Sequence, residues 1–261
     1  MSHIIEKLLK TDRAASQPMG FKAAHSAAAE QRLLIFAGLS SPDIEELPDY
    51  LDGADAVLLR PGESPLPTDT VKTLVASLDD IPVGIHMDGL DTAELKPLLK
   101  AGCDFVVFPA TCPVSAIPED DDTGSIIQVE SSLDDGLLRA INDLPTDAAI
   151  ITDSFEDVGT LVWHQLMIVR HVTALMKKPV IIPVSLKATE SELKSLWEAG
   201  VGGVIVEVDV KKRDGIKKLR GIIEKLPARS APKKGKAEAL LPYPGGARET
   251  KPEEEEEEEY E

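Results

Sequence analysis

A short apolar run, Ser125-Ile126-Ile127-Gln128-Val129-Glu130, ends in an amide and a carboxylate. Runs of the same kind recur from residue 33 to residue 208, and most of them precede a segment with helical periodicity. Strands that are apolar nearly throughout are typical of parallel sheets, which are covered on both faces. The stretch is therefore predicted to be the fifth of a series of parallel strands.

The full series contains eight predicted strands. They are Leu33–Leu39, Ala56–Arg60, Pro82–His86, Phe105–Pro109, Ser125–Glu130, Ala148–Thr152, Pro179–Ser185 and Gly203–Val208. The predicted helices between and after them are Pro42–Leu51, Thr68–Leu78, Thr92–Ala101, Leu133–Asn142, Thr160–Lys177, Glu190–Ala199 and Asp209–Leu226. The fourth unit is irregular, because residues 111–123 contain two prolines and an acidic run and are predicted to form a loop.

This alternation predicts an α/β fold, a (βα)8 TIM barrel over residues 33–227. An open doubly wound sheet would usually carry a glycine-rich phosphate turn after its first strand, and Gly38-Leu39-Ser40-Ser41-Pro42 lacks that pattern. The turns after the seventh and eighth strands have no glycine either, which disfavours a sugar-phosphate or flavin ligand.

Segments of different composition flank the predicted barrel. Residues 1–32 have helical periodicity over 2–12 and over Lys22–Arg32, and they are expected to form a lid over the amino-terminal end of the barrel. Residues 228–261 contain seven consecutive glutamates and are expected to be a disordered acidic tail. Within the tail, Leu240-Leu241-Pro242-Tyr243 is a candidate peptide for binding a protein partner.

Composition limits the functional classes. The formal net charge is −18 and there is no basic stripe interleaved with aromatic residues, so nucleic-acid binding is not expected. The two cysteines, Cys103 and Cys112, are not spaced as CxxC, which favours a reduced, cytoplasmic setting. Neither a signal-peptide core nor a long apolar span is present, so no membrane partner is expected.

Several segments, taken in order, resemble the HpcH/HpaI aldolase and citrate-lyase-beta family of the phosphoenolpyruvate/pyruvate barrel superfamily. They are Asp80–His86, Leu95–Pro109, Ile127–Glu130 and Val201–Asp209. The resemblance implies a metal-dependent carbon–carbon lyase that acts on a small 2-oxo acid. It also leaves homo-oligomerisation open, because barrels of this family often assemble.

The resemblance implies metal ligands at two strand ends. Gln128-Val129-Glu130-Ser131 matches a family motif that makes Glu130 a ligand, and Asp153 is the candidate for a second ligand after the sixth strand. Two carboxylates would suit Mg²⁺ or Mn²⁺. A structural alternative is that Glu130 caps the following helix or pairs with Arg60.

Three further residues are candidates for catalysis at the same end of the barrel. His86 and Asp88 follow the third strand and could act as a general acid or base, although a histidine at a strand end is more often structural. Arg60 could bind a substrate carboxylate, or could balance Glu130 or Glu207.

The family's pattern is incomplete in this chain. No arginine follows the third strand, and the glycine–proline turn before Asp153 is absent. Two functional hypotheses therefore stand: a divergent metal-dependent lyase, and a catalytically degenerate barrel that serves as a binding or assembly protein. His164 and His171, in the long helix after the sixth strand, favour packing or an oligomer contact.

Overall fold

The computed structural model describes residues 2–14, 32–40, 47–60, 67–78, 80–87, 92–117, 122–155, 159–208 and 213–227. Its strands are β1 (Leu34–Leu39), β2 (Ala56–Leu59), β3 (Val83–His86), β4 (Phe105–Pro109), β5 (Gly124–Val129), β6 (Ala148–Ile151), β7 (Val180–Pro183) and β8 (Val201–Glu207). All pair in parallel, in chain order, and β1 also pairs with β8, which closes the barrel. The predicted TIM barrel is confirmed.

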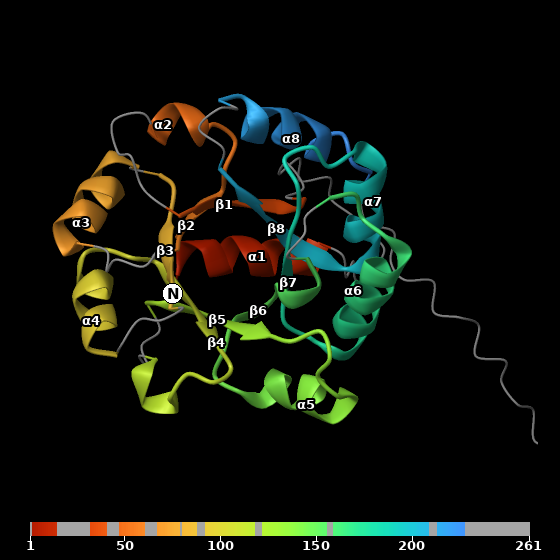
Figure 1. The fold of residues 1–261 in the computed structure, drawn as a ribbon, viewed down its shortest axis with the longest axis horizontal. Coiled ribbons are helices and arrows are strands. Elements are labelled where there is room, and N and C mark those ends of the chain that lie inside the picture. Colours follow the sequence, from red (N-terminus) through yellow and green to blue (C-terminus); the bar gives the residue numbers. More distant parts are fainter. Residues whose placement is uncertain are drawn as a thin grey trace, which may run out of the picture. The chain divides into compact units, whose positions relative to one another are not determined.

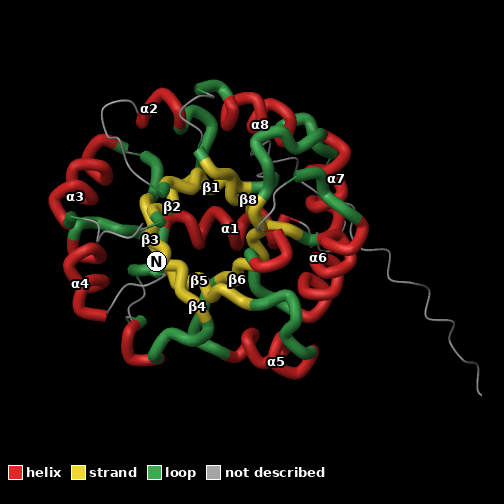
Figure 2. Tube along the Cα trace, in the orientation of Figure 1, coloured by secondary structure: helices red, strands yellow, loops and turns green. Residues whose placement is uncertain are grey.

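Helices form an outer layer around this ring of strands (Figures 1 and 2). They are α2 (Leu47–Tyr50), α3 (Thr68–Ser77), α4 (Thr92–Lys100), α5 (Asp135–Ala140), α6 (Trp163–Leu175), α7 (Glu190–Ala199) and α8 (Gly215–Ile223), whereas α1 (His3–Ala14) lies inside this layer. Three 3-10 turns, η1 (Val114–Ala116), η2 (Ile141–Asp143) and η3 (Asp153–Phe155), complete the described elements.

Helix α7 has characteristic residues at both of its ends. Thr189 accepts a hydrogen bond from the backbone of Glu192, whose side chain in turn accepts one from the Thr189 backbone, so α7 begins with a capping box. It ends at Gly200, whose φ of +108° favours glycine. Helix α2 is described only from Leu47. The predicted helix 22–32 and the acidic tail lie outside the described residues.

Two hydrophobic cores lie on the two sides of the strands. The larger core fills the space between strands and outer helices. The smaller core fills the barrel interior, where Phe36 of β1 and Phe105 of β4 meet edge to face with centroids 5.8 Å apart. Two glycines make room for these rings: a Cβ at Gly84 would lie 2.3 Å from the Phe105 ring, and one at Gly203 would lie 2.8 Å from the Phe36 ring.

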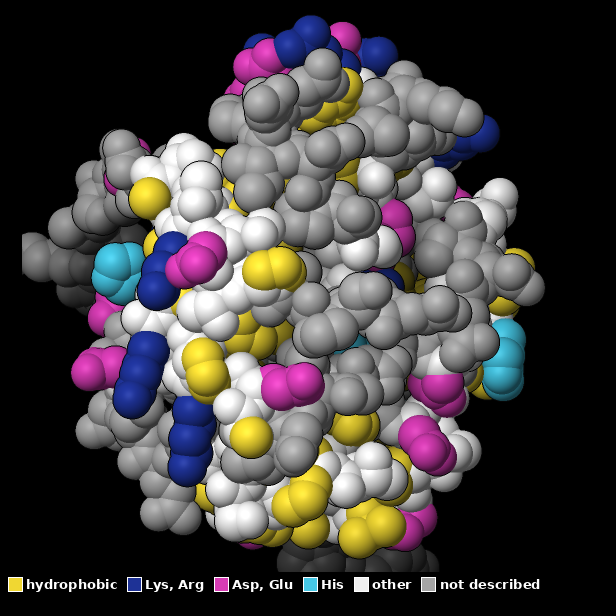
Figure 3. All heavy atoms as spheres, turned by 60° about the vertical axis from the view of Figure 1, so that its left-hand side comes forward, with side chains coloured by type: hydrophobic (Ala, Val, Ile, Leu, Met, Phe, Trp, Pro, Cys, Tyr) yellow, Lys and Arg dark blue, Asp and Glu magenta, His cyan; other side chains and the backbone are white. Residues whose placement is uncertain are grey.

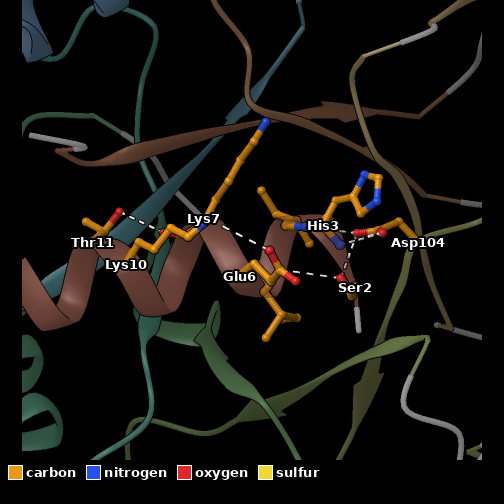
Figure 4. A network of polar contacts seen from close by, with 9 residues as sticks. Ser2, His3, Glu6, Lys7, Lys10, Thr11 and Asp104 are labelled. Carbon is orange, nitrogen blue, oxygen red and sulfur yellow. Dashed lines mark hydrogen bonds and ion pairs between the residues drawn. The ribbon is translucent and has the colours of Figure 1, made fainter. Parts of the chain in front are cut away.

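Helix α1 closes the amino-terminal end of the barrel, as predicted for a lid, and crosses the ring of strands in Figure 2. Its apolar face (Ile4, Ile5 and Leu8) is part of the inner core. Asp104, just before β4, accepts hydrogen bonds from the Ser2 hydroxyl and from the backbone N–H groups of residues 3 and 4 (Figure 4). A carboxylate from 100 residues away thus caps the helix start.

The exposed surface carries charges of both signs. On the face shown in Figure 3, Lys and Arg side chains lie among Asp and Glu side chains and scattered hydrophobic ones. Among the helices the structure describes, none combines the length and the apolar character that crossing a membrane would need.

Candidate functional site

A group of polar side chains lies at the carboxyl end of the barrel, the end at which (βα)8 enzymes carry their active sites. It comes from residues at or just past the ends of five strands. They are Arg60, His86, Gln128, Thr152 and Glu207. Most of the other inward-facing positions are apolar or glycine, because the inner core fills the barrel below this layer.

Arg60 and Glu207 form an ion pair across the first strand. The Arg60 Nη1 lies 2.7 Å from the Glu207 Oε1. Of the two partners that the sequence left open, Glu130 and Glu207, the structure therefore pairs Arg60 with Glu207. Gly38 of β1 lies beneath the pair, and a Cβ there would be 2.7 Å from the Glu207 Oε1. The absence of a side chain at residue 38 therefore lets the carboxylate lie over β1.

The guanidinium of Arg60 also has a polar atom without a partner. Its Nε is buried and has no acceptor in the described part of the chain. A buried N–H without an acceptor costs about 1–3 kcal/mol. The arginine side chain is 31% exposed and that of Glu207 is 51% exposed, so the ion pair itself contributes only about 0–1 kcal/mol.

His86 belongs to a second chain of hydrogen bonds across the mouth. Its Nε2 lies 2.9 Å from the Gln128 Oε1, and the Gln128 Nε2 donates to the Thr152 hydroxyl at 2.7 Å. Because the amide nitrogen is used on Thr152, the amide oxygen accepts, and the imidazole carries a proton on Nε2. His86 as a whole residue is 8% exposed, so this contact holds a nearly buried side chain.

The two predicted metal ligands, Glu130 and Asp153, lie at the rim of the barrel and have different hydrogen-bond partners. Both Asp153 oxygens accept hydrogen bonds from the Ser131 backbone, and the Ser131 hydroxyl also donates to one of them. Glu130 is exposed and its Oε2 lies 3.4 Å from the Ser132 hydroxyl. Asp153 thus orders the turn after β5.

In the described ranges no three His, Cys, Asp or Glu side chains are grouped so that they could hold a metal ion. Asp88, the remaining predicted catalytic residue, lies outside the described residues. The metal site stays a prediction, and the chemistry derived below does not use it.

Sequence reasoning overlooked three of the residues that meet at the mouth. Gln128 was read as part of a motif, whereas it is the partner of His86; Thr152 and Gly38 had no role. Strand parity is the signal that could have found the first of these. Residues 126 and 128 alternate with 127 and 129, so Gln128 shares the inward face with the core residue Ile126.

The solved structures that resemble this chain include alpha-subunits of tryptophan synthase. The alpha-subunit of tryptophan synthase from Pyrococcus furiosus matches with a TM-score of 0.54 and 16% identity, over 75% of this chain and 97% of that chain. A mutant of that subunit gives the same TM-score and identity over 98% of its length. The tryptophan synthase complex from that organism matches with a TM-score of 0.53 and 15% identity, over 75% of this chain and 97% of that chain. No family model and no curated protein matches the sequence.

At this identity the likeness shows the fold alone. It nevertheless corrects the sequence analysis, because the structural neighbours belong to a (βα)8 family other than the HpcH/HpaI aldolase and citrate-lyase-beta family. The resemblance to that family was wrong, and so was the metal-dependent lyase of a 2-oxo acid that it implied.

The reason for the error is that the matching segments are common to barrels. Leu95–Pro109, the longest of them, is the end of α4, a turn at Gly102 with φ of +105°, and the buried strand β4. Any unit of this fold needs such a helix end and such a strand. The alternative hypothesis, a barrel that serves in binding or assembly, stays a prediction.

Proposed function

We propose that the chain binds a small molecule with a carboxylate group at the carboxyl end of the barrel. Arg60 would be the anion receptor, and His86 would exchange a proton with the bound molecule. The observation that carries the proposal is the buried Nε–H of Arg60, which has no acceptor among the described residues. A carboxylate that takes bonds from Nε and a neighbouring Nη would satisfy it in the bidentate geometry typical of arginine.

Glu207 would stay beside such a ligand and oppose it. It contacts Arg60 through Nη1, whereas the Nη that forms a fork with Nε is the other one, so the two carboxylates would use different edges of the guanidinium. Half of the Glu207 side chain is exposed, so repulsion between the two carboxylates would turn it outward to water, and Gly38 beneath it places no side chain in the way.

His86 is suited to proton exchange because its position is fixed. The contact with Gln128, itself held by Thr152, sets both the ring orientation and the proton on Nε2. An acid or base must lie within hydrogen-bond reach of the proton that it transfers, and a fixed ring provides that reach. The proposal includes neither a metal nor carbon–carbon cleavage.

Thermal unfolding with a panel of small carboxylates tests this function. The panel should contain monocarboxylates, dicarboxylates and α-amino acids, with the matching alcohols or amides as uncharged controls. A ligand present at 100 times its Kd adds about 2.7 kcal/mol to the stability of the native state, which is a readable shift. Isothermal titration of the best ligand then gives its Kd.

Three variants make the test specific. Arg60→Lys keeps the charge but loses the planar fork, and we expect at least about tenfold weaker binding. Glu207→Gln removes the competing charge and should tighten binding. Arg139→Lys, in the exposed pair of Arg139 with Asp135 on α5, is the matched control and should bind as the wild type does. Equal stabilisation of wild type and Arg60→Lys, or none with any carboxylate, would refute the proposal.

A further inference from the structure

The ion pair of Arg60 with Glu207 leaves one polar atom on each partner for a bound molecule. On Arg60 this atom is Nε, a buried donor without an acceptor in the described part of the chain. On Glu207 it is Oε2, because the contact with Arg60 uses Oε1 and no other described residue bonds to this carboxylate. A donor and an acceptor are therefore available on two side chains that already touch.

Both side chains can be reached from the mouth of the barrel. A Cβ at Gly38 would lie 2.7 Å from the Glu207 Oε1 and 3.1 Å from its Oε2, so the carboxylate lies across the backbone of β1. There it stands between β8, to which Glu207 belongs, and Arg60, which follows β2. The Glu207 side chain is half exposed and that of Arg60 is about one-third exposed, so a ligand can touch both while the pair stays together.

The charges around the mouth favour a ligand that is not purely anionic. Among the described residues at the strand ends, or within four residues after them, three are carboxylates and two are cations. They are Glu130, Asp153, Glu207, Arg60 and Lys187, with a sum of −1. Lys187 is exposed, and Arg60 already faces Glu207. Like charges brought together weaken binding, so a simple carboxylate is opposed here.

A positive charge on the ligand reverses this opposition. The ligand's carboxylate would accept from Nε and from the second Nη of Arg60, and an ammonium group on the same molecule would donate to Glu207. Hydrogen bonds between two charged groups are roughly twice as strong as those between neutral groups. Glu207 would then be attracted to the ligand and would keep its position over Gly38.

We propose that the ligand of this site is a small amino acid, whose carboxylate binds Arg60 and whose ammonium group binds Glu207. The inference rests on the proposed function, because it uses the same arginine, and it adds the class of ligand. Glu207 is the residue that determines specificity: it attracts a zwitterion and repels a carboxylate that has no positive charge.

Isothermal titration with matched small molecules tests the proposal. Alanine and β-alanine are both propionate with an added ammonium group, at two different distances from the carboxylate, and γ-aminobutyrate is related to butyrate in the same way. Ethylamine has the ammonium group but no carboxylate. At least one of the three amino acids should bind about tenfold more tightly than its parent acid, as expected for one added charge-assisted hydrogen bond. Ethylamine should bind more weakly than that amino acid.

Glu207→Gln separates the two classes of ligand. Glutamine keeps the shape of the side chain and an oxygen that can accept from Arg60, but it has no charge. The preferred amino acid should bind this variant about tenfold more weakly than the wild type, whereas propionate and butyrate should bind it more tightly. Glu6→Gln is the matched control, because Glu6 is similarly exposed in a pair with Lys10 on α1, and it should change neither affinity.

The outcomes distinguish this inference from the proposed function. Amino acids that bind no more tightly than their parent acids, an equal affinity for ethylamine, or a Glu207→Gln variant that binds both classes more tightly would each overturn the inference. In these cases, weaker binding of propionate by Arg60→Lys would leave the proposed carboxylate site in place. Binding of none of these compounds, or equal binding by wild type and Arg60→Lys, would overturn both.

Discussion

Replacing Gly84 by alanine should destabilise the barrel by overfilling its interior. Gly84 of β3 pairs with Phe105 of β4, and a Cβ at Gly84 would lie 2.3 to 2.4 Å from three carbons of the Phe105 ring. That ring cannot retreat easily, because it is fully buried and meets Phe36 edge to face. Phe36 is in turn confined by Gly203, where a Cβ would lie 2.8 Å from its ring.

The expected cost follows from two opposing effects. Overpacking a core by one methyl group costs about 1–3 kcal/mol, and the confined ring places this site at the upper end. Alanine restricts the unfolded chain more than glycine does, which returns about 0.4–1 kcal/mol. We expect a net loss of about 2 kcal/mol, or roughly 4–8 °C in Tm for a domain of this size.

Urea and thermal unfolding of four variants measure this effect: Gly84→Ala, Phe105→Leu, the two changes combined, and Gly221→Ala. Gly221→Ala in α8 is the matched control, because no atom lies within 4 Å of its added Cβ. An alanine inside a helix should stabilise by about 0.5–1 kcal/mol, the opposite sign. Combining Gly84→Ala with Phe105→Leu should cost less than the sum of the two single changes. A Gly84→Ala variant as stable as the wild type would refute the reasoning.

Two further predictions concern helix starts. Asp104→Ala removes the acceptor for three donors at the start of α1 and should lower the free energy of unfolding by about 1–2 kcal/mol. Amide hydrogen exchange in α1 should become faster. Unchanged exchange there would contradict the assigned role. At the start of α7, burial raises the pKa of Glu192, but hydrogen bonds from Thr189 and from the Leu161 N–H outweigh this and lower it. Because the folded-state pKa is depressed, the stabilisation is present above the ordinary value of 4.5 and is lost as the pH falls through the folded-state pKa. The stability difference between wild type and Glu192→Gln should therefore shrink in acid, and a difference independent of pH would argue against it.

The sequence predicted the barrel because its signals are local. Each strand is a short apolar run, and turns such as Gly102 and Gly200 have the positive φ that favours glycine there. Helix lengths were less accurate: the segment predicted as 160–177 forms α6 over residues 163–175. The predicted loop at 111–123 is confirmed for its described residues, which hold only η1.

The site was harder to predict because its contacts join distant strands. Whether Arg60 pairs with Glu130 or with Glu207 depends on the closure between β1 and β8, which no local pattern encodes. The contact of His86 with Gln128 skips β4 and crosses the barrel interior, so it depends on the tilt of the strands. Glu130 follows β5 but points to solvent, and a motif match did not reveal this.

The lid described above also has a kinetic consequence. Helix α1 precedes every strand of the barrel in the chain, yet its apolar face belongs to one core with interior side chains of β1 and of β8. Its binding surface is therefore complete only after the last strand has been synthesised and paired. Contacts over such long sequence separations form slowly. Ile4, Ile5 and Leu8 thus remain open to water, or to a chaperone, until β8 has been synthesised, and docking of α1 is expected to be the last step in the folding of the barrel.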